Sequence, residues 1–462
     1  MSAVESARPR TGRGAEAALL LFAVLIVAAA EAIVEATRTG TIGTDVVRYA
    51  GVAAALGLIT HLAVWFRARY ADPVMVPCVV LINGLGLVMI HRLDLGLKQS
   101  AAEGGPRYYG PSAPTQMVWT ALGLALFVGL LLILRDQRSL ARYAYTIGLA
   151  GLVFLAVPAV LPARYSEVNG AKIWIRAFGF SLQPGELAKI ALCIFASAYL
   201  VGKRDVLSLA GRKVLGLELP RGRDLGPVLV AWLICIGVLV LGHDLGTSLM
   251  FFGLFVVLLY VATERVSWLI IGLLLFAGGT VAAYHLFGNL RTRVDVWLHP
   301  FRYVDTGYQI RQSLFGLGTG GIFGTGLGGG RPESVPVVKS DFIISAFGEE
   351  LGLFGLVALL VVYALLIFRG LSAALLVRDA FSKLLATGLS FSLGLQLFVV
   401  VAGATKLLPE TGLTTPFLSY GGSSLVANYV LLALLIRVSD SARRPRTTSS
   451  EALTTAPVEA SA

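Results

Sequence analysis

Long runs of apolar residues, separated by short polar stretches, dominate this chain of 462 residues. A helix needs roughly 20 predominantly apolar residues to cross a bilayer, and the runs have about that length. The pattern predicts an all-α polytopic membrane protein with segments at about 16–35, 46–66, 73–91, 116–134, 143–162, 184–201, 225–241, 247–263, 268–287, 344–367, 382–402 and 417–436. Only residues 243–247 separate the seventh segment from the eighth, so the two can be separate helices or one broken helix.

Composition and charge agree with this class. Hydrophobic residues make up 56% of the chain and charged residues 14%, which lies outside the range of soluble domains. The net charge of +11 raises the alternative of nucleic-acid binding. However, placing the N-terminus inside sends more than half of the basic residues to the cytoplasm, as in membrane proteins generally. We therefore predict a multi-pass plasma-membrane protein with both termini cytoplasmic, disordered tails over 1–14 and 438–462, and no nucleic-acid partner.

The longest weakly apolar stretch, 288–343, is predicted to lie outside the cell and is rich in glycine and basic residues such as Arg293. A second outer loop carries Lys172 and Arg176. Basic residues on the outer side run against the usual distribution. Two interpretations remain open: these side chains bind the phosphates of a substrate, or they pair with lipid phosphates and with nearby carboxylates.

Asp341 is the sharpest candidate for chemistry, because it precedes the tenth apolar segment at its outer end. A carboxylate there can act as a general base on an attacking hydroxyl. The alternative is that Ser340 or Asp341 caps the helix that follows.

Other ionisable residues lie within or at the ends of apolar segments, where an unpaired charge is costly. Glu186 and Lys189 share a helix face and can pair. Glu349, Glu350 and Asp244 are placed near outer segment ends, so the group predicts a polar cavity that opens outwards.

The glycines of 316–330 lack the Gly-Lys-Ser/Thr ending of a nucleotide-binding loop, so they favour tight turns or a re-entrant segment. Residues 419–424, Ser-Tyr-Gly-Gly-Ser-Ser, open the last helix, where their hydroxyls can touch a substrate or serve caps and close packing. No metal-ligand motif is visible.

Several short blocks occur in order between residues 73 and 437: 170–176 with 180–189, 244–247, 307–314, 340–352 and 409–428. Together they resemble the SEDS family, the RodA and FtsW cell-wall polymerases. The chain departs from that pattern at Gly185, where serine is usual, and at Lys339-Ser340, where His-Thr is frequent.

The resemblance implies a SEDS-like ten-helix core over 73–437. Residues 15–72 would add two extra N-terminal transmembrane helices, as in RodA-type proteins of actinobacteria. This gives about 12 transmembrane segments, with the large extracellular loop 288–343 between the ninth and tenth.

The resemblance also implies an activity. Such proteins are peptidoglycan glycosyltransferases that polymerise lipid II for cell elongation and shape, with undecaprenyl pyrophosphate as leaving group and a class B penicillin-binding transpeptidase as partner. Asp341 matches their essential aspartate and is predicted to be catalytic. The predicted substrate-binding residues are Lys172, Trp174, Arg176, Gln183, Glu186, Lys189, Arg293, Gln309, Gln312, Ser313, Ser419, Tyr420 and Ser423, while Asp244, Glu349 and Glu350 would shape the cavity.

Among cofactors, the resemblance alone suggests a divalent cation, Mg or Mn, and we expect no nucleotide, haem or flavin. The expected partners are lipid II, the undecaprenyl pyrophosphate-linked glycan, the transpeptidase and membrane lipid. The alternatives are a lipid II flippase or transporter, a division-specific FtsW-type polymerase, and a non-catalytic scaffold for a transpeptidase.

Overall fold

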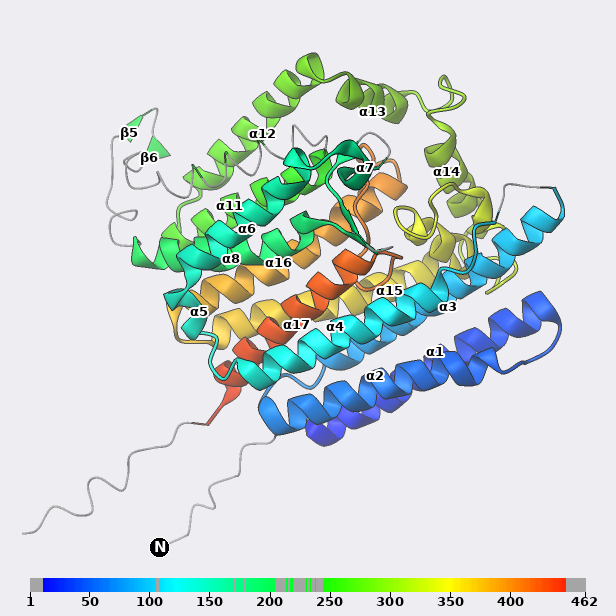
Figure 1. Ribbon diagram of the computed structural model, residues 1–462, viewed down its shortest axis with the longest axis horizontal. Helices are drawn as coiled ribbons and strands as arrows, with labels where there is room; N and C mark the ends of the chain where they lie inside the picture. The colour runs from blue at the N-terminus through cyan, green and yellow to red at the C-terminus, as the bar shows by residue number, and fades with distance from the viewer. Residues whose placement is uncertain are drawn as a thin grey trace, which may run out of the picture.

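The computed structural model describes residues 11–104, 108–168, 171–177, 180–203 and 244–445, and between 204 and 243 only residues 213–214, 217–218, 230, 233 and 237. Long helices running side by side form an elongated bundle (Figure 1). They are α1 (Arg13–Thr39), α2 (Asp45–Arg67), α3 (Met75–Ala102), α4 (Ala113–Ile133), α6 (Ala144–Val160), α8 (Pro184–Gly202), α11 (Leu245–Thr263), α12 (Ser267–Leu286), α15 (Ile343–Leu376), α16 (Ala380–Ala404) and α17 (Gly422–Arg443).

These helices correspond to eleven of the twelve predicted segments. Within the described residues, ten are long and apolar enough to cross a membrane, while α6 is shorter. The predicted seventh segment, 225–241, lies almost entirely outside the described residues, and so does the question of one broken helix or two. The chain is a multi-pass helical membrane protein.

Helix α17 lies at the centre of the bundle, packed against α4, α8, α15 and α16. Its burial continues past residue 437, where the core was predicted to end. Asp440 accepts a hydrogen bond from the Tyr70 backbone N–H at 2.8 Å, and Ser439 Oγ accepts one from Asp72 N–H at 2.9 Å. The predicted tail boundary is therefore wrong: these contacts keep the helix ordered to Arg443.

The N-terminal pair, α1 and α2, packs along the bundle beside α3 (Figure 1). A charged contact joins α1 to α3, because Glu31 Oε1 lies 2.6 Å from His91 Nδ1. At its C-terminal end, α1 also reaches the long loop: Arg38 Nη2 donates to the Gly330 carbonyl oxygen at 2.8 Å. The additional helices therefore contact the loop as well as the core.

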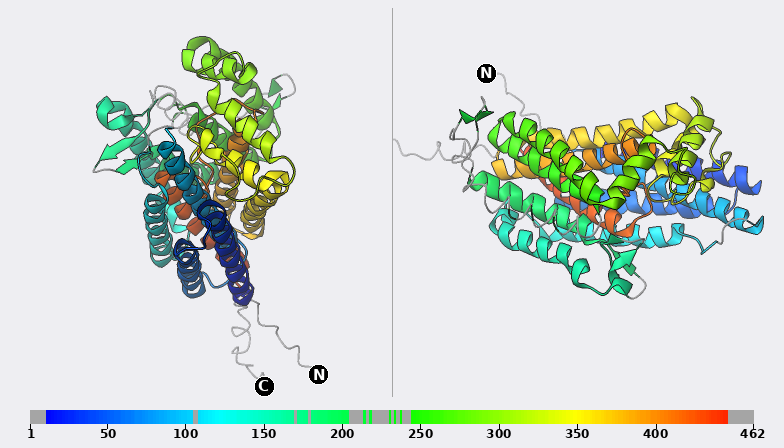
Figure 2. Two further views of the ribbon diagram at one scale, coloured as in Figure 1. Left: turned by 90° about the vertical axis from the view of Figure 1, so that its right-hand side faces the viewer. Right: turned by 90° about the horizontal axis from the view of Figure 1, so that it is seen from above.

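The long loop between α12 and α15 is itself largely helical. It contains α13 (Gly288–Leu298), α14 (Tyr308–Gly320) and the 3₁₀ turn η1 (Pro332–Ser334). Figure 1 shows α13 and α14 towards the end of the bundle where α15 begins, with the start of α1 and the end of α17 at the opposite end. Figure 2 shows that the long helices keep a common direction when the bundle is turned.

Short strands are the exceptions to the all-α expectation. The connection between α6 and α8 contains α7 (Ala163–Ser166) and two small antiparallel hairpins, β1 (Glu167–Val168) with β2 (Ala171–Lys172) and β3 (Ile175–Ala177) with β4 (Phe180–Leu182). A third hairpin pairs β5 (Lys213–Val214) with β6 (Leu217–Glu218). The helix α5 (Ser139–Arg142) follows α4.

Helix α15 is kinked at Gly352, which has a φ of +66° that favours glycine. A regular helix would bond the N–H groups of residues 353 and 354 to the carbonyls of 349 and 350. Instead, those N–H groups donate to carbonyls of the glycine-rich loop at 2.9 and 3.2 Å, and the loop N–H groups of Thr325 and Gly326 donate to the two helix carbonyls at 3.0 Å. The loop therefore replaces the hydrogen bonds that the kink breaks.

Candidate functional site

Asp341 lies immediately before α15, at the end of the bundle near α13 and α14, and is half-buried. Its backbone N–H donates to the Val337 carbonyl oxygen at 3.2 Å. The N-cap residue of α15 is Phe342, so neither Ser340 nor Asp341 occupies the capping position. The predicted capping alternative is therefore wrong, and the Asp341 carboxylate is not committed to the helix end.

The connection between α16 and α17, residues 405–421, fixes the backbone next to Asp341. The Tyr420 N–H donates to the Lys339 carbonyl oxygen at 2.8 Å, and the Ser419 hydroxyl donates to the Ser340 carbonyl oxygen at 2.5 Å. Gln116 of α4 in turn donates to the Ser419 carbonyl oxygen at 3.0 Å. Two predicted substrate-binding residues, Ser419 and Tyr420, thus hold the segment that carries the candidate base.

Two charged residues act on Asp341. Arg293 of α13 donates from Nη1 to the Glu410 carbonyl oxygen at 2.9 Å, which docks α13 on the 405–421 connection. Burial raises the pKa of Asp341, and the Ser340 hydroxyl and the Arg293 charge oppose that rise. Burial also raises the pKa of Glu410 to about 7, with the negative charge of Asp341 as the second cause. A carboxylate with a raised pKa is a stronger base.

Lys339, beside this carboxylate, is held by α3. Its Nζ lies 2.5 Å from Asp94 Oδ1 and 3.0 Å from Ser112 Oγ. Asp94 also accepts the backbone N–H groups of Ser112 and Ala113 at 2.8 Å, at the start of α4. The Lys339 charge is therefore anchored by two transmembrane helices.

A cavity of about 800 Å³ adjoins this segment. Ser340 and Tyr420 line it from the Asp341 side. The opposite part is formed by the C-terminal end of α3 and by the long loop, with basic groups from Arg38, Arg331 and Lys339 and carboxylates from Glu103 and Glu333. A cavity of this size, with several cations in its wall, can accept the anionic headgroup of a large amphiphile.

A second group of predicted residues gathers around the start of α11. Gln183 Nε2 donates to Asp244 Oδ2 at 3.3 Å, and the Gln183 backbone N–H donates to Ser423 Oγ at 2.8 Å. Asp244 caps α11 by accepting the Thr247 N–H at 2.9 Å, and burial raises its pKa. Lys172 lines a small pocket together with Gln183 and Asp244.

Glu186 and Lys189 form the predicted pair inside the bundle, with Nζ 3.0 Å from Glu186 Oε2. Lys189 also donates to Gln396 Oε1 of α16 at 2.8 Å, and Gln396 donates onward to the Thr414 carbonyl oxygen at 2.9 Å. Both charges are buried, so the pair links α8 and α16 to the 405–421 connection.

Several predicted substrate-binding residues are not brought to this site by any contact in the described structure. Ser313 is fully buried and donates to the Ala404 carbonyl oxygen at 2.9 Å, so its hydroxyl serves packing of α14 and does not face a substrate. Gln309 and Gln312 share α14 with it and are partly exposed. Trp174 and Arg176 belong to the hairpin connection, where Arg176 is exposed on β3.

Glu349 and Glu350 hold the glycine-rich loop. Glu349 Oε1 accepts the Arg331 N–H at 2.7 Å, and Glu350 Oε2 accepts the Gly328 N–H at 3.0 Å. Glu350 also pairs with Arg92 of α3. These contacts are structural, and they support the cavity wall formed by the loop.

Comparison with known proteins agrees with this arrangement. The sequence profile of the FtsW/RodA/SpoVE cell cycle protein family matches residues 72–444. The chain belongs to this family. The peptidoglycan glycosyltransferase RodA of Mycobacterium tuberculosis (strain H37Rv) is 55% identical over 436 residues, which are 94% of this chain and 92% of the relative. The probable peptidoglycan glycosyltransferase FtsW of Geobacter metallireducens is 33% identical over 377 residues, covering 80% and 95%.

Two solved structures of the FtsW/RodA/SpoVE kind are similar in fold. One describes the structural coordination of polymerization and crosslinking by a peptidoglycan synthase complex; it aligns with a TM-score of 0.63 and 29% identity over 81% of this chain and 99% of that chain. The other is the rod shape determining protein RodA of Thermus thermophilus, with a TM-score of 0.57 and 26% identity over 81% and 98%. The family profile begins at residue 72, so helices α1 and α2 of this chain lie outside the part that it matches.

Three residues of this FtsW/RodA/SpoVE protein were missed by sequence reasoning. Arg92 had a visible signal, because a charged residue within an apolar segment must find a partner. Asp94 had the same signal. Glu410 had none, since a glutamate in a short connection between two apolar segments is ordinary until the fold brings it to Asp341.

A divalent cation fits one feature of the site. Within the described residues, no three His, Cys, Asp or Glu side chains gather as a metal site. Mg²⁺, however, is often held by one or two carboxylates together with substrate phosphates. Asp341 and Glu410 supply two carboxylates whose charges act on each other.

Proposed function

We propose that this chain is a RodA-type peptidoglycan glycosyltransferase that polymerises lipid II in the plasma membrane. The observation that carries the proposal is the half-buried Asp341 carboxylate, which is not used as a helix cap and follows directly after Ser340, a residue that lines a large cavity with three basic side chains in its wall. The names of the mycobacterial relatives, at 53–55% identity over 94% of this chain, support the same activity.

In the proposed reaction, Asp341 accepts the proton of the acceptor sugar hydroxyl as that oxygen attacks the anomeric carbon of the donor. A new glycosidic C–O bond forms, the anomeric C–O bond to phosphate breaks, and the pyrophosphate leaves with the bonding electron pair. Burial raises the pKa of Asp341, which favours proton transfer from a hydroxyl. The fixed backbone around Ser340 keeps the base in place.

The leaving pyrophosphate carries the largest charge in the reaction. Arg293 and the basic residues of the cavity wall are the groups in this chain that can stabilise it. A bound divalent cation, held by Asp341 with Glu410, would supply further neutralisation of the phosphates. Lys172 and Arg176, on the neighbouring outer connection, would contact more distal parts of the substrate.

A role in elongation is favoured over division because the RodA relatives are 55% identical and the FtsW relative 33%. A class B transpeptidase as partner is supported by the similarity to the solved peptidoglycan synthase complex. Both termini would be cytoplasmic, since the arginine-rich ends of α2, α4 and α17 lie at the bundle end opposite Asp341.

The test uses purified protein with a cognate class B transpeptidase, fluorescent lipid II and Mg²⁺ or Mn²⁺. Wild-type protein should give glycan ladders on a gel, and Asp341→Asn should give none while remaining folded. Ladders that persist in the folded variant would remove Asp341 from the mechanism. If neither protein makes ladders, but wild type moves fluorescent lipid II across liposome membranes, the flippase alternative holds. If neither protein makes ladders or moves lipid II, and Asp341→Asn supports the transpeptidase as well as wild type does, the scaffold alternative holds.

A further inference from the structure

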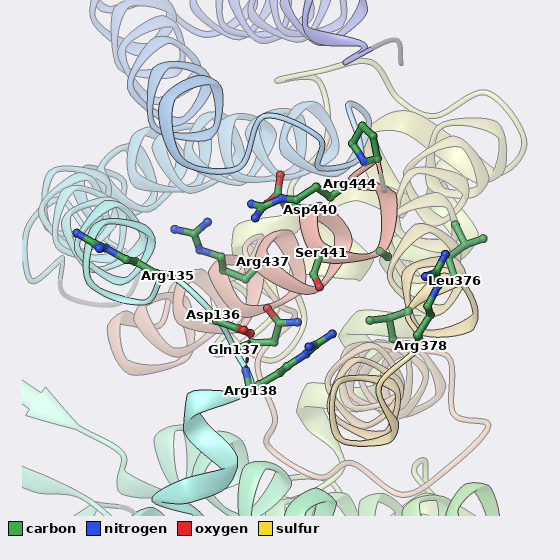
Figure 3. Close-up of a pocket in the computed structure, with 13 residues that line it drawn as sticks. Arg135, Asp136, Gln137, Arg138, Leu376, Arg378, Arg437, Asp440, Ser441 and Arg444 are labelled. Carbon is green, nitrogen blue, oxygen red and sulfur yellow. Dashed lines mark hydrogen bonds and ion pairs between the residues drawn. The ribbon is translucent and has the colours of Figure 1, made fainter. Parts of the chain in front are cut away.

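A second polar cavity lies at the end of the bundle opposite Asp341. It has a volume of about 350 Å³ and opens between the ends of α4, α15 and α17 (Figure 3). Five arginines line it, namely Arg135, Arg138, Arg378, Arg437 and Arg444. They come from three separate parts of the chain, so the fold itself gathers them.

The positive charge of this arginine pocket is only partly compensated. Two aspartates, Asp136 and Asp440, share the lining with the five arginines, and Asp379 lies 3.5 Å from Arg138, so a surplus of two positive charges remains. Arg444 Nη2 donates to Asp440 Oδ2 at 2.7 Å. Within the described part of the chain, neither Arg135 nor Arg378 makes an ion pair.

Arg437 is the most deeply placed of the five and fixes the pocket floor. It is 4% exposed and donates to the carbonyl oxygens of Arg67 and Leu131. Its Nε is buried and has no hydrogen-bond partner among the described atoms. The Arg437 guanidinium is therefore held by the protein itself, and the exposed arginines around it are the groups that can meet a ligand.

The position of the pocket indicates the kind of ligand. It lies where three membrane-spanning helices end, which is the level of lipid headgroups. The pocket lining includes an exposed apolar side chain of α15, Leu376, which is 60% exposed, and the last residue of α4, Ile133, is 84% exposed two positions before Arg135. A ligand here would therefore meet arginines at one end and an apolar surface at the other.

We propose that the arginine pocket binds the phosphate headgroup of an anionic phospholipid from the leaflet at this end of the protein. Guanidinium groups bind phosphate oxygens through paired N–H donors, and basic pockets between helix ends are suited to anionic headgroups. The acyl chains of such a lipid would lie along the exposed ends of α4 and α15. A soluble phosphate shares the headgroup chemistry but would gain nothing from the apolar flank.

Binding at this pocket would join three connections of the bundle. The α4–α5 connection already contacts α16, because Gln137 Nε2 donates to Ser382 Oγ at 3.0 Å and Arg138 lies 3.5 Å from Asp379. A phosphate held by arginines from α17 and from both connections would add a bridge among all three. The lipid should therefore stabilise the protein against thermal unfolding.

The experiment measures thermal unfolding of the purified full-length protein in neutral detergent during titration with phosphatidylglycerol or phosphatidylcholine. The test variant is Arg135→Gln with Arg378→Gln, both exposed and without ion pairs in the described structure. The matched control is Arg142→Gln with Lys203→Gln, which removes the same charge from exposed positions at the same end of the bundle but outside the pocket.

Phosphatidylglycerol should raise the unfolding temperature of wild type and of the control in a saturable way, and phosphatidylcholine should not. The test variant should need about tenfold more phosphatidylglycerol, which corresponds to losing the phosphate contacts of two arginines. Equal weakening in the control variant would overturn the pocket in favour of general surface charge. A saturable shift with inorganic phosphate or glycerol 3-phosphate alone, lost in the test variant, would overturn the lipid assignment in favour of a soluble anion.

Discussion

Two groups of charged side chains flank the start of α15, and their charges are balanced very differently. Arg92 is fully buried and donates to Glu350, to Glu333 at 2.5 Å and to the Gly330 carbonyl oxygen at 2.6 Å. Asp341 is half-buried, and within the described residues it has no ion pair. Glu350, the partner of Arg92, follows Asp341 by nine residues along the chain.

This difference in charge balance distinguishes a carboxylate that stabilises the fold from one that can take part in a reaction. A buried charge whose hydrogen bonds are all made is expensive to disturb but has no capacity for a substrate. A carboxylate that is partly dehydrated yet uncommitted has a raised pKa and can take a proton. The surrounding contacts, more than the residue type, therefore distinguish Glu350 from Asp341.

The largest effect is expected at Asp341. Asp341→Asn keeps the size of the side chain but removes the base, so the polymerisation rate should fall by about 10²- to 10⁴-fold. Glycan ladder assays measure the rate, and thermal unfolding should stay unchanged because no ion pair is lost. The matched control is Asp305→Asn, which makes the same chemical change at an exposed residue of the same loop and should retain full activity.

For the group of residues around Arg92, we expect substitution to lower stability, the quantity that Asp341→Asn leaves unchanged. Arg92→Ala leaves the buried Glu350 without its ion-pair partner and Glu333 with Arg38 alone, which should lower the stability by about 3–5 kcal/mol, as for other broken buried ion pairs. The measurements are detergent-solubilised yield and thermal unfolding. Adding Glu350→Gln to this variant should restore part of the loss, because the uncompensated buried charge is then reduced. If Arg92→Ala left stability intact and abolished only activity, the contrast between the two groups would be broken.

A smaller and pH-dependent effect is expected at Glu410, whose pKa is raised to about 7 from an ordinary value near 4.5. The folded protein therefore binds the proton of the Glu410 carboxyl group more tightly than the unfolded chain does. Protonation of Glu410 therefore contributes to the free energy of unfolding at low pH, and this contribution is lost as the pH rises towards and through 7.

Glu410→Gln should therefore remove part of the fall in unfolding temperature between pH 5 and pH 8. Activity should match wild type below about pH 6, where Glu410 is protonated in wild type as well. The two proteins should diverge above pH 7.5, where Glu410 carries a charge beside Asp341. Identical thermal profiles at all pH values would show that Glu410 does not titrate in this range.

The smallest effect is expected at Lys339. Lys339→Met breaks a largely buried ion pair with Asp94, but Asp94 keeps the backbone N–H donors of Ser112 and Ala113, so the stability cost should be about 1–3 kcal/mol. The loss of a cation from the cavity wall should raise KM for lipid II with little change in kcat. A change in kcat alone would instead place Lys339 in the chemical step.

Much of the fold could be predicted because apolar length alone defines a membrane span. The exceptions are instructive. The end of α17 was missed because Ser439 and Asp440 are polar in sequence and are buried only through contacts with residues some 370 positions earlier. The helices of the long loop, α13 and α14, were missed because they have only 11 and 13 residues and are too weakly apolar to stand out as spans.

The candidate site was predicted in part. Asp341 was found from its position and from a family resemblance, while its relation to Arg293 and Glu410 needed the fold. Ser313 shows the converse: it lies in a block that resembles the family, yet its hydroxyl is buried against α16. Resemblance identifies the block, and only coordinates show which side chain in it faces a cavity.

The exchange of hydrogen bonds at the kink of α15 has a practical consequence for labelling the protein. The segment around Gly326 cannot be cut, lengthened or replaced by a tag, because α15 would then carry two unpaired carbonyls and two unpaired N–H groups next to the membrane. The stretch around Val304, which is 69% exposed and lies between α13 and α14, makes its hydrogen bonds within the loop, as from Arg311 Nη2 to the Val304 carbonyl oxygen at 2.5 Å, and none to α15 within the described residues. An epitope or fluorophore placed there would report from the outer surface while the polymerase keeps its shape.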